Sequence, residues 1–197
     1  MRFKASMILL VALFCSCALA QRRSAPASDN NASDWKEFSS AEGQFTVSLP
    51  GTPKTDTNTV DTPIGQLKSR AFVLETDNFL YYVTYVDLPG GPETLEETKE
   101  ALDASRDRAV AKHRLITEKD ITLDGIAGRE LLVERGDTGL ILKNRFFYAK
   151  QRLYQLILTG RRNVVFVHGK PSPNEKDQTD LFQKTSAKFL DSFKLTK

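Results

Sequence analysis

The sequence predicts an α+β domain in which an antiparallel sheet of roughly six to nine strands is covered by two helices. Most of the chain alternates apolar and polar residues in short runs that end at turn residues, which is the pattern of hairpin strands. One run is apolar on both faces, so we expect a sheet that is covered on both sides. Two longer segments instead have helical periodicity and begin at helix-start signals.

The first strand is predicted over Gln44–Leu49, and Pro50 and Gly51 end it, because proline has no N–H to donate to a sheet. The letters GTPK that follow suggest a phosphate loop. The spacing G-x-x-x-x-G-K-[ST] between a strand and a helix is missing, however, and Lys54 leads into a threonine-rich, strand-like segment. HGKPS fails the same test, because Pro171 replaces the hydroxyl residue. No nucleotide site is therefore predicted at either place.

The strand that is apolar on both faces is FLYYVTYVDL, residues 79–88. A strand over residues 66–75 precedes it, and a helix separates it from the strands that follow. A tight hairpin turn is predicted at Asp124-Gly125. The later strands are predicted over 115–123, 126–135, 139–149 and 153–159, with a further short one at 163–167.

The first helix is predicted to begin at Thr94, which forms a capping box with Glu97, and to run to about Arg114. Acidic residues crowd its start and basic residues its end, as the helix dipole favours. His113 belongs to that basic last turn, which predicts a structural role for it. One apolar stripe should face the sheet, and it consists of Leu95, Leu102, Ala109 and Val110.

The second helix is predicted to begin at a capping box over Ser172–Glu175. Its apolar face should be core, and it consists of Phe182, Phe189, Leu190 and Phe193. Replacing Phe189 by alanine should therefore destabilise the domain, whereas Lys188→Ala should hardly change its stability.

Residues 1–20 have the basic start, short apolar core and small-residue exit of a secretory signal peptide, with cleavage expected between Ala20 and Gln21. The apolar core is shorter than the roughly 20 residues that span a bilayer. An alternative is a lipoprotein signal, in which Cys17 carries the lipid and anchors the protein to a membrane. Residues 21–34 are polar and predict a flexible linker, so a single domain is expected over residues 35–197.

The composition of the chain excludes several kinds of functional site. Both cysteines lie in the signal segment, so cleavage after Ala20 leaves no thiol for a disulfide, a metal site or a nucleophile. The segment holds two of the 28 basic residues, which leaves 26 against 25 acidic ones. A net charge of +1 without clustering does not predict nucleic-acid binding. We expect a secreted or periplasmic protein.

Three stretches, FTVSLPGTP, YYVTYVDLP and FLDSFKL, resemble the PsbP-like superfamily. That group takes its name from an extrinsic subunit of photosystem II, and it includes a nuclear Ran-binding relative and many secreted bacterial proteins. The resemblance covers about Trp35 to Lys197 and rests on apolar positions that mark the fold. It implies an α/β/α sandwich with a mostly non-catalytic binding or accessory role, and it transfers no functional residue to this chain.

Few residues suggest a catalytic or ligand-binding role. His113 and His168 have no metal-ligand spacing, no G-x-S-x-G elbow is present, and no catalytic residue, metal or cofactor is predicted. The best candidate is a basic set for an anionic ligand or partner, in which Lys143 and Arg145 share one face of a strand. The alternative interpretation is an edge strand protected by charge. The full set is Lys143, Arg145, Arg161, Arg162 and Lys170.

Three hypotheses for function follow from these observations. The first is an exported, non-catalytic binding or accessory protein of the cell envelope, whose partner is an envelope protein or a small anionic ligand. The second is an envelope hydrolase whose active-site residues are dispersed along the sequence, since such residues meet only in the fold. The third is a scaffold protein held at the membrane by a lipid on Cys17.

Overall fold

A computed structural model describes residues 35–62, 65–111, 113–136, 139–161, 166–167, 170–171 and 174–196. The predicted signal segment, its cleavage site and the linker lie outside the described residues. The same holds for Arg162, His168 and Ser172 of the predictions above.

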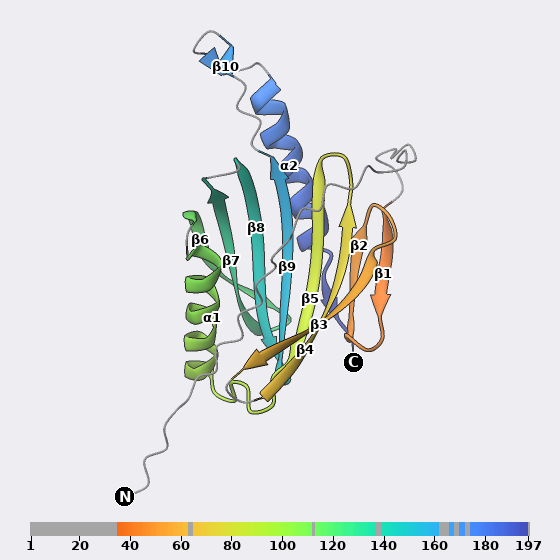
Figure 1. Ribbon diagram of the computed structural model, residues 1–197, viewed down its shortest axis with the longest axis vertical. Helices are drawn as coiled ribbons and strands as arrows, with labels where there is room; N and C mark the ends of the chain where they lie inside the picture. Colours follow the sequence, from red (N-terminus) through yellow and green to blue (C-terminus); the bar gives the residue numbers. More distant parts are fainter. Residues whose placement is uncertain are drawn as a thin grey trace, which may run out of the picture.

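The central element is a seven-stranded antiparallel sheet in the order β3-β4-β5-β9-β8-β7-β6 (Figure 1). A three-stranded sheet, β1-β2-β12, and a short hairpin, β10-β11, are separate from it. The strands of the large sheet are β3 (Lys54–Thr62), β4 (Gly65–Glu75), β5 (Phe79–Asp87), β6 (Arg114–Leu123), β7 (Ile126–Arg135), β8 (Leu140–Ala149) and β9 (Arg152–Arg161). The other elements are β1 (Lys36–Ser40), β2 (Phe45–Leu49), α1 (Leu95–Val110), β10 (Phe166–Val167), β11 (Lys170–Pro171), α2 (Asn174–Leu190) and β12 (Lys194–Leu195).

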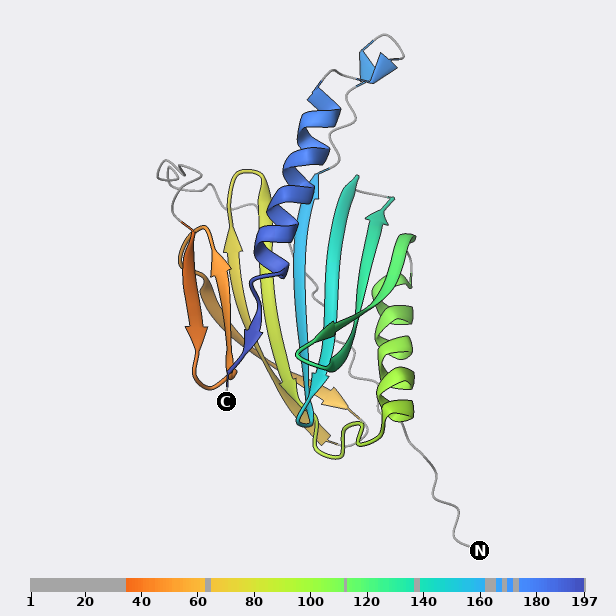
Figure 2. The same ribbon diagram turned by 180° about the vertical axis from the view of Figure 1, so that it is seen from behind.

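The two faces of the large sheet carry different layers. On one face α1 packs against β7 and β8, whereas α2 and the three-stranded sheet cover the other face (Figures 1 and 2). Two hydrophobic cores result, one under each layer. Strand β5 contributes Tyr81, Val83 and Tyr85 to one core and Val86 to the other. The predicted α+β architecture with a sheet covered on both faces is therefore confirmed.

Several predicted details are confirmed as well. Lys54 begins β3, so GTPK is part of the connection between two strands and not a phosphate loop. Asp124 and Gly125 form the two-residue turn of the β6–β7 hairpin, and both have positive φ, 50° and 82°. Positive φ at both central residues is the requirement of a type I′ turn, which glycine meets without strain. Thr94 and Glu97 form the predicted capping box at the start of α1.

The predicted end and apolar stripe of α1 need correction. The helix ends at Val110 rather than near Arg114, so His113 lies beyond it and not in its last turn. Leu102 is buried, but Leu95 is 77% exposed and does not face the sheet. The reason is local, since Leu95 is the first residue of the helix and the buried residues of α1, Ala101 and Leu102, lie almost two turns further on.

The aromatic face of the second helix is core, as predicted. Phe182, Phe189 and Leu190 are buried on α2, and the ring of Phe189 packs edge-on against Tyr81 at 5.3 Å. Phe193 is also buried, but α2 ends at Leu190, so this ring reaches the core from the turn after the helix. It stacks on Phe147 of β8 at 6.1 Å.

Glycine is required at residue 128 of β7 by a close approach. A Cβ there would lie 2.4 Å from the Phe147 ring and 2.6 Å from the Phe146 carbonyl oxygen. We expect Gly128→Ala to lower the free energy of unfolding by about 1–3 kcal/mol, because overpacking forces the ring and the neighbouring strand to move. Gly136→Ala is the matched control, since nothing lies within 4 Å of its Cβ position. Urea denaturation with equal losses in both variants would contradict this packing.

Candidate partner-binding face

The structure brings together two members of the predicted basic set. Lys143 and Arg145 share one face of β8, as their spacing predicted, and this face is turned toward the α2 side. Arg161 is the last residue of β9, Lys170 lies in β11, and Arg162 lies outside the described residues. The edge-strand alternative is wrong, because β8 lies between β9 and β7 and the edges of the sheet are β3 and β6.

Lys143 and Arg145 both contact Glu130 of β7, whose side chain is only 6% exposed. Arg145 donates from Nε to Glu130 Oε2 at 2.6 Å, and from Nη2 to Asp191 Oδ1 at 2.7 Å. Lys143 Nζ lies 3.5 Å from Glu130 Oε1, and Lys119 Nζ of β6 lies 3.1 Å from the same oxygen. Three strands and the turn after α2 thus meet in one charge network.

The network keeps Glu130 ionised in a buried position. Burial by itself raises the pKa of Glu130, but the Arg145 hydrogen bond and the charges of Arg145 and Lys143 outweigh it, so the pKa is lowered. The three cations of the network face two carboxylates, those of Glu130 and Asp191. The positive charge is therefore in excess by one.

Apolar side chains flank this network on the same face of the sheet. Ile121, Leu132 and Ile141 are partly buried at the margin of the core under α2. In Figure 2, α2 lies over β9, and most of β7 and β8 is not covered by it. We call this region the uncovered face, and it comprises Lys119, Ile121, Glu130, Leu132, Ile141, Lys143 and Arg145.

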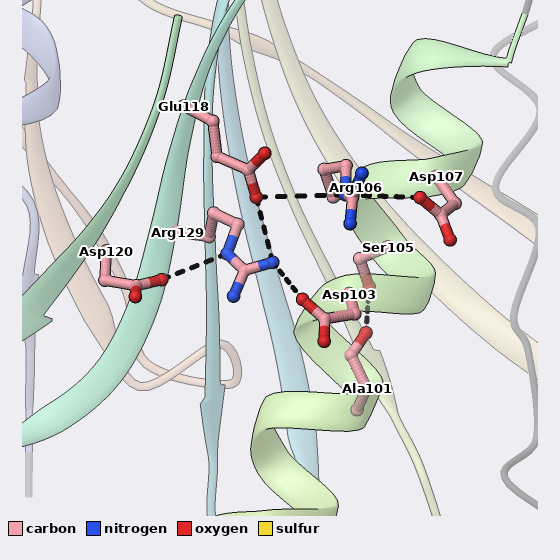
Figure 3. A network of polar contacts seen from close by, with 8 residues as sticks. All are labelled: Ala101, Asp103, Ser105, Arg106, Asp107, Glu118, Asp120 and Arg129. Carbon is pink, nitrogen blue, oxygen red and sulfur yellow. Dashed lines mark hydrogen bonds and ion pairs between the residues drawn. The ribbon is translucent and has the colours of Figure 1, made fainter.

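The opposite face of β7 carries a second charge network, centred on Arg129 (Figure 3). The guanidinium of Arg129 is buried, and its Nε donates to Asp120 Oδ1 at 3.1 Å. Its Nη1 pairs with Asp103 of α1 and lies 3.0 Å from Glu118 Oε1. The Arg129 hydrogen bond is the main cause that lowers the pKa of Asp103. This network holds α1 against β6 and β7.

Arg129 and Glu130 were not singled out by the sequence analysis, nor was Lys119. A signal was present, because Arg129 and Glu130 are adjacent charges in the stretch IAGRELLV of β7, which is otherwise apolar, so they must point to opposite faces. Both are 5% exposed. Charged residues are rarely buried unless they are paired, so each predicts partners on its own face.

Two further searches concern only the part of the chain that the structure describes. There, no three His, Cys, Asp or Glu residues are grouped so that they could hold a metal ion. Neither of its two helices is long and apolar enough to cross a membrane.

Comparisons with known proteins support the fold and not a function. No family model and no curated protein matches the sequence. The solution structure of cyanobacterial PsbP from Synechocystis is similar, with a TM-score of 0.51, 12% identity, and coverage of 87% of this chain and 98% of that one. A Pseudomonas aeruginosa protein of unknown function, described as a putative regulator, has a TM-score of 0.38 at 11% identity over 78% of this chain and 94% of that one. The similarity to the PsbP structure shows that the chain has a PsbP-like fold.

Proposed function

We propose that the chain is an exported, non-catalytic binding or accessory protein of the cell envelope, and that it binds an acidic segment of a partner protein on the uncovered face. The observation that carries this proposal is the sharing of Glu130 Oε1 by Lys119 and Lys143. A lysine ammonium has three donors, so one shared acceptor leaves donors on both lysines for other carboxylates.

The surroundings of the two lysines fit such a partner. Lys119 has an exposed side chain, whereas that of Lys143 is 16% exposed, so a ligand would meet one exposed and one largely buried cation. Partly buried Ile121, Leu132 and Ile141 supply apolar surface beside them. Interfaces combine a desolvated apolar centre with polar groups at the rim, and charge complementarity selects the partner.

Affinity for an acidic chain tests this proposal. A short fluorescent poly-glutamate peptide should bind the parent protein, and fluorescence anisotropy should show weaker binding to Lys119→Glu, which reverses one exposed charge. The matched control is Lys54→Glu on β3, which makes the same change in net charge at an exposed position elsewhere on the sheet. Equal loss of binding in the two variants would mean that only net charge matters, and this would contradict a site at the uncovered face.

Export is the second part of the proposal, and its support is the signal pattern of residues 1–20. We expect the protein recovered from outside the cytoplasm to begin at Gln21. N-terminal sequencing together with intact mass measures this directly. A lipid-modified Cys17 as the first residue would instead place the protein on a membrane and favour the scaffold hypothesis.

A further inference from the structure

A second polar cluster lies on the same side of the sheet, under the turn that joins β1 and β2. Arg70 of β4 and Tyr85 of β5 are directly opposite each other in the strand register. Asp87 of β5 and Arg152 of β9 are likewise opposite. Glu42, in the turn between β1 and β2, completes the cluster, which shares no residue with the uncovered face.

Both arginines converge on Glu42. Arg70 Nη1 pairs with the Glu42 carboxylate, and Arg152 Nη1 donates to the Glu42 carbonyl oxygen at 2.9 Å. Arg152 also donates from Nε to Asp87 Oδ1 at 2.6 Å, and its guanidinium carbon lies 4.4 Å from the centre of the Tyr85 ring. Stacking on an aromatic ring fixes the plane of a guanidinium and so fixes the direction of its remaining donors.

The hydroxyl of Tyr85 is the unusual group in the cluster. Tyr85 is 3% exposed, and its Oη makes no hydrogen bond of proper geometry with any described residue, although it lies near the Glu42 carboxylate. Burial, with a further contribution from Glu42, raises the pKa of Tyr85 to about 12, so the hydroxyl keeps its proton at neutral pH. A buried donor without an acceptor is unfavourable, so an acceptor at this place would be stabilising.

We propose that Arg70, Tyr85 and Arg152 form a binding site for an oxyanion, a carboxylate or a phosphate, and that the Glu42 carboxylate occupies this site until a ligand displaces it. With Glu42 in place the two arginines face two carboxylates, Glu42 and Asp87. Once the Glu42 side chain has left, the positive charge exceeds the negative by one. An arriving oxyanion would then accept from Arg70 and from the Tyr85 hydroxyl together.

The surrounding backbone permits this exchange. The turn is held by main-chain acceptors, because Tyr154 Oη donates to the Gly43 carbonyl at 2.9 Å and Arg152 donates to that of Glu42. The Glu42 side chain is 59% exposed, so its carboxylate can swing into solvent while the turn stays in place. The bound carboxylate thus competes from within the chain, at an effective concentration on the order of millimolar.

Removing the Glu42 carboxylate, which competes with the ligand, tests this proposal. Isothermal titration with inorganic phosphate and with acetate should show that Glu42→Ala binds at least one of them about tenfold more tightly than the parent does, because the internal carboxylate no longer competes. Preference for phosphate or for acetate then identifies which kind of oxyanion the site takes. The matched control is Glu37→Ala, which removes an exposed carboxylate from neighbouring β1 and should leave binding at the level of the parent. Equal affinities in Glu42→Ala and the parent would overturn the proposal.

Substitution of Tyr85 provides a second test of the site, by ligand affinity and by thermal stability. In the Glu42→Ala background, Tyr85→Phe should lose most of the gained affinity, since the ligand would lose a donor. In the parent background, the same substitution should leave the thermal midpoint unchanged or raise it, because the hydroxyl makes no hydrogen bond. A lowered thermal midpoint of Tyr85→Phe in the parent background would contradict the role of the Tyr85 hydroxyl as a donor to the ligand. Unchanged affinity of the double variant relative to Glu42→Ala would contradict it as well.

Discussion

Replacing Phe189 by alanine is expected to lower the free energy of unfolding by about 3–5 kcal/mol. The ring of Phe189 is fully buried and packs edge-on against Tyr81, so it stabilises the packing of α2 on β5. A loss of this size is a large part of the roughly 5–15 kcal/mol that stabilises a domain. Chemical denaturation of the variant beside the parent measures it. A variant that unfolds at the denaturant midpoint of the parent would mean that α2 is not docked.

The control for this variant is Lys184→Ala, which is exposed on the same helix and should change the free energy by less than about 0.5 kcal/mol. Lys188, next to Phe189, was expected to be neutral from the sequence. In the structure its Nζ lies 4.6 Å from the centre of the Trp35 ring, a cation–π geometry worth about 0.5–1 kcal/mol at an exposed site. Lys188 therefore helps to fix Trp35, the first residue that the structure describes.

Glu130→Gln is expected to have an effect of similar size. The substitution keeps the shape of the side chain but removes the buried negative charge that faces Lys143 and Arg145. Breaking a buried pair by removing one partner typically costs about 3–5 kcal/mol. Here Lys143 loses its carboxylate partner, whereas Arg145 keeps only Asp191. Chemical denaturation at neutral pH measures the loss. Glu37→Gln, an exposed carboxylate on β1, is the control and should be close to the parent.

The pH dependence of the same variant tests the cause of the loss. The pKa of Glu130 in the folded protein is lowered from its ordinary value of 4.5. Its contribution to stability is therefore fully present above that value and is lost as the pH falls through the lower folded pKa. The difference between the parent and Glu130→Gln should narrow in acid. A difference that stays constant down to low pH would mean that packing, and not charge, causes the loss.

The elements of the fold were largely predictable, because their signals are local. Alternation identified β5 as a strand apolar on both faces, and the Thr94–Glu97 pair located the start of α1. Strands β1 and β12 were missed, because they exist only through pairing with β2. The five residues of β1 and the two residues of β12 contain no local signal that determines this pairing.

The candidate site was less predictable. Alternation did place Lys143 and Arg145 on one face of β8, but it could not reveal that Glu130 lies beneath them, since the strand order decides which side chains meet. The cluster around Tyr85 is even harder to predict from the sequence. It joins Glu42, Arg70 and Arg152, which are up to 110 residues apart in the sequence.

Mapping the binding of an acidic peptide by NMR is the most direct test of the central claim that the uncovered face is the partner site. The amide resonances of ¹⁵N-labelled protein would be followed during titration with the poly-glutamate peptide. We predict saturable shifts at Lys119, Leu132 and Lys143, with little change along β3. Shifts gathered around Arg70 and Arg152 would assign acidic ligands to the oxyanion cluster, and shifts along β3 would assign them to the sheet edge. Either result would contradict the uncovered face as the binding surface.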